Sequence, residues 1–214
     1  MQKADRRKGL RHLYGPSARE VVEVDVPEMR FLMVDGEGDP DGQPFKDALG
    51  TLYAVSHALK FAVRERDAID YAVSPAEGLW SSTDPALFNI QNEEDCRRTA
   101  ANRRTWRWTL MVMQPEPVTA GPFEEIRDRV EVKKGSAAVS GVRLGSFREG
   151  RSAQILHLGP YAEEWPTVKS VHDFISGLGA EPVGRHHEIY LNDPSRTKPE
   201  NLRTVIRQPF GRTQ

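Results

Sequence analysis

Alternating apolar and polar residues indicate the first strands of the chain. Valines alternate with acids over residues 22–26, and residues 30–34 are mostly apolar. Because side chains of a strand point alternately to opposite faces, this pattern predicts two short strand pieces joined at Pro27. The glycine-rich segment 35–40 then predicts a turn, since glycine adopts backbone angles that other residues avoid.

Two segments carry apolar residues at the three- and four-residue spacing of an amphipathic helix. The first begins near Pro44 and runs to residue 66, and the second spans residues 167–178. Proline suits a first helical turn because its missing N–H has no partner there, and glycines at 177 and 179 end the second segment. We expect the first helix to lie on a sheet.

Other apolar segments predict further strands. They are residues 70–80, 106–115, 142–148, 153–158, 186–192 and 202–208. Pro75 interrupts the first of them, which is typical of an edge or a bulge. A short helix is expected at residues 123–129, and the long polar connection 81–104 has the length of a flap or an insertion.

The order strand, helix, strand, strand occurs in each half of the chain, and each final strand ends in Gln-Pro. We therefore predict an α+β fold that arose by tandem duplication, with pseudo-two-fold symmetry and a central ligand cleft. The predicted parts are a basic N-terminal extension (1–20) and one domain (21–214) made of two pseudo-repeats (21–116 and 141–210) and a linker (117–140). In each half the first strand after the helix carries an acid, Glu77 or Glu188, and both are expected to face the cleft.

Composition narrows the function classes. The 30 basic and 31 acidic residues give a net charge of -1, so no global field attracts nucleic acid or an anionic membrane. No apolar run reaches the roughly 18 residues of a membrane span. The single cysteine, Cys96, excludes an internal disulfide and any multi-cysteine metal site. We expect a cytoplasmic protein, monomeric or weakly dimeric, with a solvated N-terminal tail.

The segment HHEIYLNDP, which begins at His186, carries the most specific polar pattern. On a strand, Glu188 shares one face with His186 and Tyr190, while the other face is largely apolar. A buried carboxylate needs a purpose or a partner, so Glu188 either faces a ligand or pairs with Arg203 or Arg207 on the adjoining strand. A metal site in this segment is not expected, because adjacent strand residues point to opposite faces.

Five segments in order resemble the GyrI-like small-molecule-binding proteins. They are VDVPEMRFLMVDGEGDP (24–40), AEGLW (76–80), WRWTLMVMQP (106–115), HHEIYLNDP (186–194) and LRTVIRQPF (202–210). The resemblance spans residues 14–210 and implies the duplicated fold shared with ligand-binding domains of multidrug-responsive regulators. About 20 polar residues before the domain are too few for a helix-turn-helix unit, so the chain resembles the stand-alone branch.

Members of that branch bind bulky, often cationic aromatic compounds, and some hydrolyse the strained cyclopropane of duocarmycin-like DNA-alkylating products. The resemblance implies a small-molecule site, without a cofactor or metal, that serves detoxification or self-resistance. It places the pocket acids at Glu77 and Glu188, the strand tyrosine at Tyr190, and the pocket tryptophans at Trp80 and Trp108. Many relatives carry a second tryptophan where this chain has Ser81, which predicts a wider or less aromatic wall.

Two functions use these residues. In a hydrolase, Glu188 is the expected base that activates water and Tyr190 the donor to the developing phenolate. In a non-catalytic multidrug-binding protein, which sequesters ligands or acts as a partner-linked sensor, an acid ringed by aromatic side chains holds a cation. Tyr71 is the expected further ring and Met111 a wall that can repack around different ligands.

Overall fold

Six antiparallel strands close into a barrel-like sheet in the computed structural model, which describes residues 2–3, 7–88, 90, 92–134 and 139–212. Their order is β6-β2-β5-β4-β8-β9, and pairing of β6 with β9 closes the ring. The bounds are β2 Val22–Glu37, β4 Ala76–Ser82, β5 Trp106–Met113, β6 Arg143–Leu158, β8 His186–Tyr190 and β9 Arg203–Arg212. Short β7 (Ala180–Pro182) extends the sheet at β9, and β1 (Gln2–Lys3) pairs with β3 (Ile69–Asp70).

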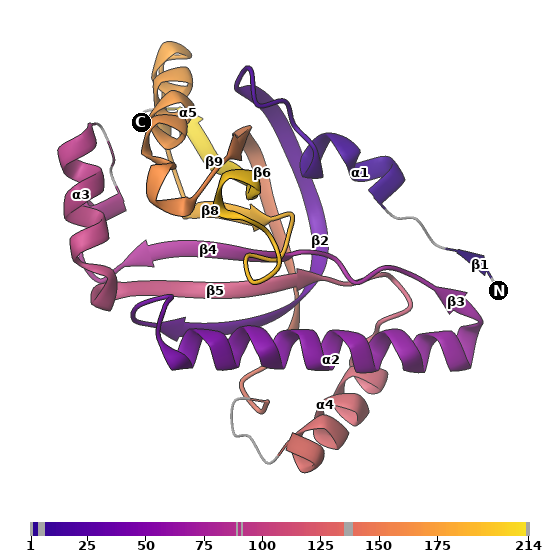
Figure 1. The fold of residues 1–214 in the computed structure, drawn as a ribbon. Helices are drawn as coiled ribbons and strands as arrows, with labels where there is room; N and C mark the ends of the chain where they lie inside the picture. The colour runs from indigo at the N-terminus through magenta and orange to yellow at the C-terminus, as the bar shows by residue number, and fades with distance from the viewer. Residues whose placement is uncertain (1, 4–6, 89, 91, 135–138, 213–214) are drawn as a thin grey trace.

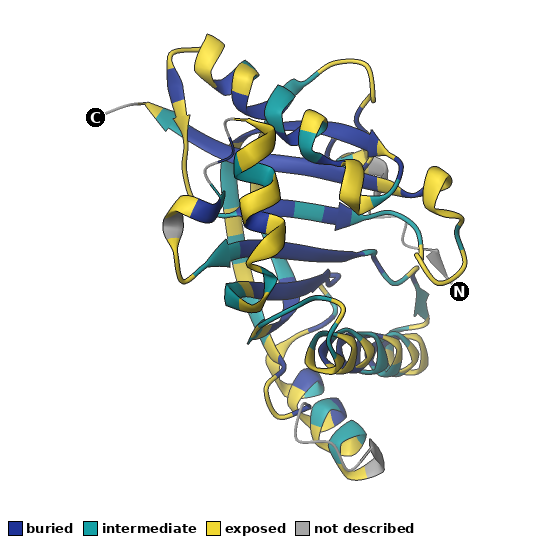
Figure 2. Cartoon of the chain, turned by 60° about the vertical axis from the view of Figure 1, so that its left-hand side comes forward, coloured by how far each residue is buried: buried dark blue, intermediate teal, exposed yellow. Residues whose placement is uncertain are grey.

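Helices cover the outside of the barrel. The α-helices are α1 Arg7–Tyr14, α2 Gln43–Asp67, α3 Glu93–Ala101, α4 Ala120–Lys134 and α5 Trp165–Gly177, and the 3-10 turns are η1 Pro85–Phe88, η2 Arg103–Thr105, η3 Tyr161–Glu163 and η4 Pro199–Asn201. In Figure 1, α2 runs along β5 on one side of the β5-β4-β8 group, and α5 lies on the other side beyond β8. Figure 2 shows the strands largely buried and the outer faces of the helices exposed.

The alternation of strand side chains divides the apolar core into an inner cluster and two outer ones. Phe31, Met111 and Ile189 belong to the inner cluster, where Leu13 of α1 joins them. One outer cluster lies beneath α2 and α4, and the other beneath α5. Removing this apolar surface from water is the main force that holds the helices on the sheet.

Two strands are longer than the sequence pattern predicted. The pieces expected on either side of Pro27 form the single strand β2, and residues 142–148 and 153–158 belong to the single strand β6. The β2–β6 register passes from Val26–Gly150 to Glu28–Arg148, and Gly150 has a φ of 75°. The register is therefore the same on both sides of Pro27, and only the Pro27–Glu149 pair is missing, because proline lacks the N–H of a ladder hydrogen bond.

The N-terminal extension is not the solvated tail that composition predicted. Residues Arg7–Tyr14 form α1, and Leu13 and Tyr14 are buried against the barrel. Similarly, the connection 81–104 contains η1 and α3, and the helix expected at residues 123–129 is the longer α4. Part of the predicted linker, residues 135–138, lies outside the described residues.

The mixed helix and sheet class is confirmed, and the strand, helix, strand, strand order is present as β2-α2-β4-β5 and β6-α5-β8-β9. The two strands that carry Glu77 and Glu188 lie side by side, since β4 pairs with β8. Duplication and pseudo-two-fold symmetry stay predictions. The adjacency of β4 and β8 positions the candidate site.

Candidate functional site

The register between β4 and β8 decides which polar side chains meet. Gly78 pairs with Glu188, whereas Glu77 pairs with Ile189. Because paired residues share a face and neighbours along a strand do not, Glu188 points outward and Glu77 points into the barrel. The expectation that both acids face one cleft is therefore wrong, and the two faces hold two separate polar groups.

On the outer face, Tyr190 joins Glu188 to Trp80. The Tyr190 hydroxyl donates to Glu188 Oε2 at 2.8 Å and accepts from Trp80 Nε1 at 3.0 Å. His186 Nε2 lies 3.3 Å from Glu188 Oε1. Burial, together with the charge of Glu188, raises the pKa of Tyr190 well above its usual value, so the phenol keeps its proton. Glu188 itself is 17% exposed and reachable from solvent.

Aromatic rings extend from this hydrogen-bonded group. Phe45 of α2 stacks on Trp80 with ring centroids 5.7 Å apart and meets the edge of Trp108 at 5.2 Å. Trp106 packs against Trp80 at 5.4 Å and against Phe88 at 5.5 Å. We call these five rings, with Tyr190, the aromatic cluster. Since they come from α2, η1 and three strands, only the folded chain assembles them.

A second acid borders the aromatic cluster at the beginning of α5. Glu164 is 7% exposed, and its neighbour Tyr161 packs edge-on against Tyr190 with centroids 5.8 Å apart. Burial raises the pKa of Glu164 well above its usual value, and the negative charge of Glu188 raises it further. Nothing in the sequence pattern singled out Glu164, because its burial depends on how α5 docks.

Gly78 permits the outer hydrogen bonds. A Cβ at this position would lie 2.8 Å from Trp80 Nε1 and 3.0 Å from the Tyr190 hydroxyl. The AEGLW segment therefore requires glycine at this position, because the side chains of Trp80 and Tyr190 approach the β4 backbone there.

We expect Gly78→Ala to separate Trp80 from Tyr190 and to lower the free energy of unfolding by about 1–3 kcal/mol, as overpacking does. Urea denaturation measures the loss, and near-ultraviolet circular dichroism reports the altered tryptophan environment. The matched control is Gly121→Ala in α4, where an added Cβ meets no atom within 4 Å. An unchanged spectrum in Gly78→Ala would contradict the assigned role.

Inside the barrel, four charged side chains form one network. His187 Nε2 donates to Glu77 Oε2 at 3.1 Å, and His187 Nδ1 contacts both oxygens of Glu149 at 3.0 Å. Arg207 Nη1 donates to Glu149 Oε2 at 3.0 Å. Two acids and two bases balance each other, which offsets the cost of burying the charges.

This network also anchors the N-terminal helix. The Tyr14 hydroxyl donates to Glu77 Oε1 at 2.7 Å, and Arg207 Nη2 donates to the Leu13 carbonyl at 2.7 Å. Gln154 connects Arg207 Nε to the carbonyl of His12. An eight-residue helix is marginal alone, so these bonds and the burial of Leu13 account for its presence.

The titration of this network predicts the pH dependence of stability. Burial alone would lower the pKa of His187, but Glu149 and Glu77 raise it to about 9, from a usual value of 6.5. Burial would raise the pKa of Glu149, but His187 and Arg207 hold it at about 2, below the usual 4.5. The His187 contribution is full below pH 6.5 and lost toward pH 9, and that of Glu149 is full above pH 4.5 and lost toward pH 2.

We therefore expect maximal stability between pH 4.5 and 6.5, with a decline on both sides. Urea denaturation across pH 3–9 measures it, and His187→Gln should flatten the alkaline decline relative to wild type. Equal wild-type stability at pH 6 and pH 9 would show that His187 is not held protonated.

Other predicted site residues fall in different places. Trp108 lies in the aromatic cluster, as expected of a residue sharing a face with Trp106. Met111 lies inside the barrel, fully buried, so the expectation that it forms a ligand wall beside the tryptophans is wrong. Tyr71 belongs to the buried cluster beneath α2, where burial raises the pKa of its hydroxyl.

Sequence reasoning missed the partners of the inner network. An ion pair between Glu188 and Arg207 was expected. In the sheet, however, Glu188 pairs with Ile206, and Arg207 points to the opposite face. Glu149 carried no local signal. An arginine within the apolar segment VIRQPF was the available clue, because a buried guanidinium requires an acid.

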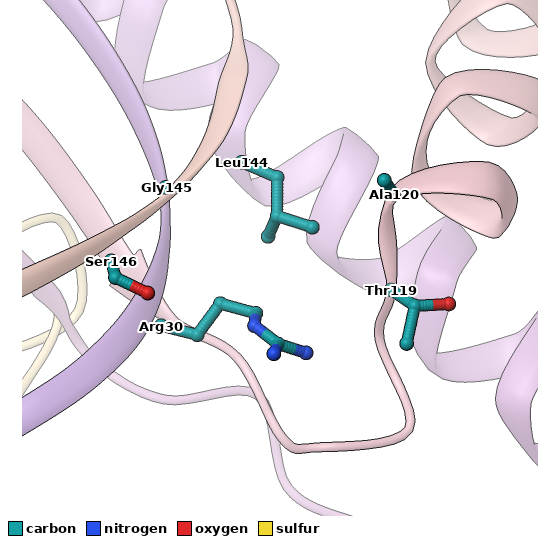
Figure 3. Close-up of a pocket in the computed structure, with 6 residues that line it drawn as sticks. All are labelled: Arg30, Thr119, Ala120, Leu144, Gly145 and Ser146. Carbon is teal, nitrogen blue, oxygen red and sulfur yellow. The ribbon is translucent and has the colours of Figure 1, made fainter.

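A hollow of about 240 Å³ lies away from the aromatic cluster (Figure 3). It is lined by Arg30, Thr119, Ala120, Leu144, Gly145 and Ser146. The Arg30 guanidinium donates to the carbonyls of Val118 at 2.6 Å and Glu116 at 3.3 Å. These bonds brace the loop before α4, which gives Arg30 a structural role.

Within the described residues, no three or more His, Cys, Asp or Glu side chains are placed to hold a metal ion. In the inner network both nitrogens of His187 already face carboxylates. No helix among the same residues is long and apolar enough to cross a membrane.

Comparison with known proteins identifies the family. An uncharacterized conserved protein from Listeria innocua is 35% identical, with a TM-score of 0.82 over 96% of this chain and 98% of that one. Two hydrolases from Listeria innocua are 34% and 32% identical, with TM-scores of 0.81 and 0.79; they cover 98% and 96% of this chain, and 100% and 98% of their own lengths. No curated protein matches significantly. The profile of the GyrI-like small molecule binding domain matches residues 113–210. The chain belongs to the GyrI-like small-molecule-binding family.

Proposed function

We propose that the chain binds bulky aromatic or cationic small molecules at the aromatic cluster and hydrolytically opens cyclopropane-bearing DNA-alkylating compounds. The observation that carries this proposal is the hydrogen-bonded group Trp80–Tyr190–Glu188, in which a protonated phenol lies beside an accessible carboxylate. Two relatives described as hydrolases, at 32% and 34% identity, support a hydrolytic reaction. The biological role would be detoxification or self-resistance.

The proposed reaction adds one water to a cyclopropane conjugated to a dienone. The water oxygen bonds to a ring carbon, the ring C–C bond breaks, and its electron pair moves to the carbonyl oxygen to form a phenolate. Glu188 accepts the proton from water, and the Tyr190 O–H or the Trp80 N–H donates a hydrogen bond to the phenolate. Because ring strain already activates the substrate, a base and a donor suffice.

Tyr161 is the proposed point of entry. It is 39% exposed and packs edge-on against Tyr190, so its displacement would open the hydrogen-bonded group to a flat ligand. Contacts between the ligand and the rings of the aromatic cluster would then replace the contact between Tyr161 and Tyr190.

A second candidate function is binding without chemistry, as in a multidrug-binding protein that sequesters ligands or senses them for a partner. Glu188 and Glu164 beside several aromatic rings favour it. A desolvated cation gains roughly 0.5–2 kcal/mol from each well-placed ring, in addition to charge pairing.

A turnover assay distinguishes hydrolysis from binding without chemistry. The protein is incubated with a duocarmycin-type cyclopropane compound, while the dienone absorbance and the product mass are followed. Faster loss of absorbance than with heat-unfolded protein, with a mass gain of one water, is the result expected of a hydrolase. Binding of the intact compound without turnover excludes hydrolysis and leaves the binding function, and absence of binding contradicts both.

A further inference from the structure

Glu164 is an acid that the proposed reaction does not use. It is more than nine-tenths buried, and the polar side chain beside its carboxyl group is the neutral hydroxyl of Thr204 on β9. A hydroxyl does not balance the charge of a buried carboxylate, so ionised Glu164 would lack a cationic partner.

Several elements surround Glu164 with titratable groups. Glu188 and Tyr190 face it from β8, Tyr161 from η3, and Cys96 from α3. The environment contains acids, phenols and a thiol. Burial, together with nearby acids including Glu164, raises the pKa of Cys96, so this thiol remains neutral.

The histidines nearby do not pair with Glu164. His157 on β6 contacts Thr167 and the Pro160 carbonyl, and burial lowers its pKa, so it remains neutral near pH 7. His186 contacts Glu188. Within the described residues, neither Glu164 nor Glu188 forms an ion pair with lysine or arginine. Two neighbouring acids without such a partner, one of them buried, cannot both ionise at low cost.

We propose that Glu164 holds a proton in the free protein and that binding of an aromatic monocation expels it. The cation supplies the missing positive charge, the Glu164 O–H bond breaks, and the proton passes to the buffer. Glu164 and Glu188 then face the ligand as two carboxylates. A neutral ligand of the same shape supplies no charge and leaves the proton in place. This inference rests on the proposed binding function.

Calorimetry tests the coupling directly. The permanent cation 10-methylacridinium and its neutral analogue 10-methylacridone are titrated into the protein at pH 7 in phosphate and in Tris. The dependence of observed heat on buffer ionisation enthalpy gives the protons exchanged. We expect about one proton released per bound cation and none per neutral ligand, with cation affinity rising about tenfold per pH unit between pH 6 and 7.

Three variants assign the proton. Glu164→Gln mimics the protonated acid and should bind the cation without release and with little pH dependence. Glu163→Gln, at an exposed neighbouring position, should behave as wild type. His186→Gln should still release the proton, because the proton belongs to Glu164. Infrared difference spectra of wild type should lose the C=O band of a protonated carboxyl group when the cation binds.

The possible outcomes distinguish a failure of this inference from a failure of the proposed binding function. Cation binding to wild type without proton release overturns the inference and leaves the binding function intact. Release that persists in Glu164→Gln and disappears in His186→Gln also overturns it, because the proton then comes from His186. Failure of both ligands to bind while the protein is folded contradicts the proposed function itself.

Discussion

Replacing Glu188 with glutamine is expected to reduce turnover of a cyclopropane substrate by about a hundred- to ten-thousandfold, the usual contribution of a general base. Glutamine has nearly the same shape but does not accept a proton from water. It still accepts the hydrogen bond from Tyr190, whose hydroxyl lies 2.8 Å from Glu188 Oε2. The fold and much of the substrate binding should therefore persist, and the loss should appear in kcat.

Single-turnover kinetics with saturating protein measure this effect without interference from product release. Glu163→Gln is the matched control, because it makes the same change at an exposed acid of η3. Tyr190→Phe should also lower kcat, while leaving the base in place. Full activity in Glu188→Gln would remove Glu188 from the chemistry and return it to a binding role.

Arg207→Met is expected to lower the free energy of unfolding by about 3–5 kcal/mol, because it removes one of the two cationic partners of the buried Glu149 carboxylate. Arg207 is fully buried and donates to Glu149, to Gln154 and to the Leu13 carbonyl. Its removal therefore also detaches α1 from the barrel. Methionine fills similar apolar volume, so the measured loss reports mainly the charge and the hydrogen bonds.

Chemical denaturation at pH 6 measures this loss, and hydrogen exchange in α1 reports its detachment. Arg129→Met on α4 is the control, since its ion pair with Glu125 is exposed and such pairs contribute less than about 1 kcal/mol. The double variant Arg207→Met/Glu149→Gln should recover part of the loss, because it also removes the unpaired charge. Equal losses in Arg207→Met and Arg129→Met would contradict the role of the network.

Local sequence patterns predict the face on which a side chain lies where that face depends only on its own strand or helix. Alternation placed Glu188 and Tyr190 on one face of β8 and separated the tryptophans of β5 from its methionines, as the structure has them. The helix at Pro44 is present as α2 for the same reason. Each feature follows from a periodicity of 2 or 3.6 residues, which is written in the order of the residues.

Positions that depend on distant segments were not predictable in this way. The eight residues of α1 have a weak local signal, and burial of Leu13 and bonds to Glu77 and Arg207 hold them in place. Glu164 is buried near Glu188 only because α5 packs on β6 and β9. Contacts between residues far apart in sequence have no local signature, so no periodicity reveals them.

The sequence by itself determined the mixed α and β class, the family, and the position of Glu188 and Tyr190 on one face of a strand. The tertiary structure decided that Glu77 belongs to the charged interior with His187, Glu149 and Arg207, whereas Glu188 lies on the outer face and bonds to Tyr190 of the aromatic cluster. The physical reason is the β4–β8 register, which sets Gly78 opposite Glu188. A shift of one residue along either strand would reverse that strand's side chains, and only hydrogen bonds between strands distant in sequence select the register.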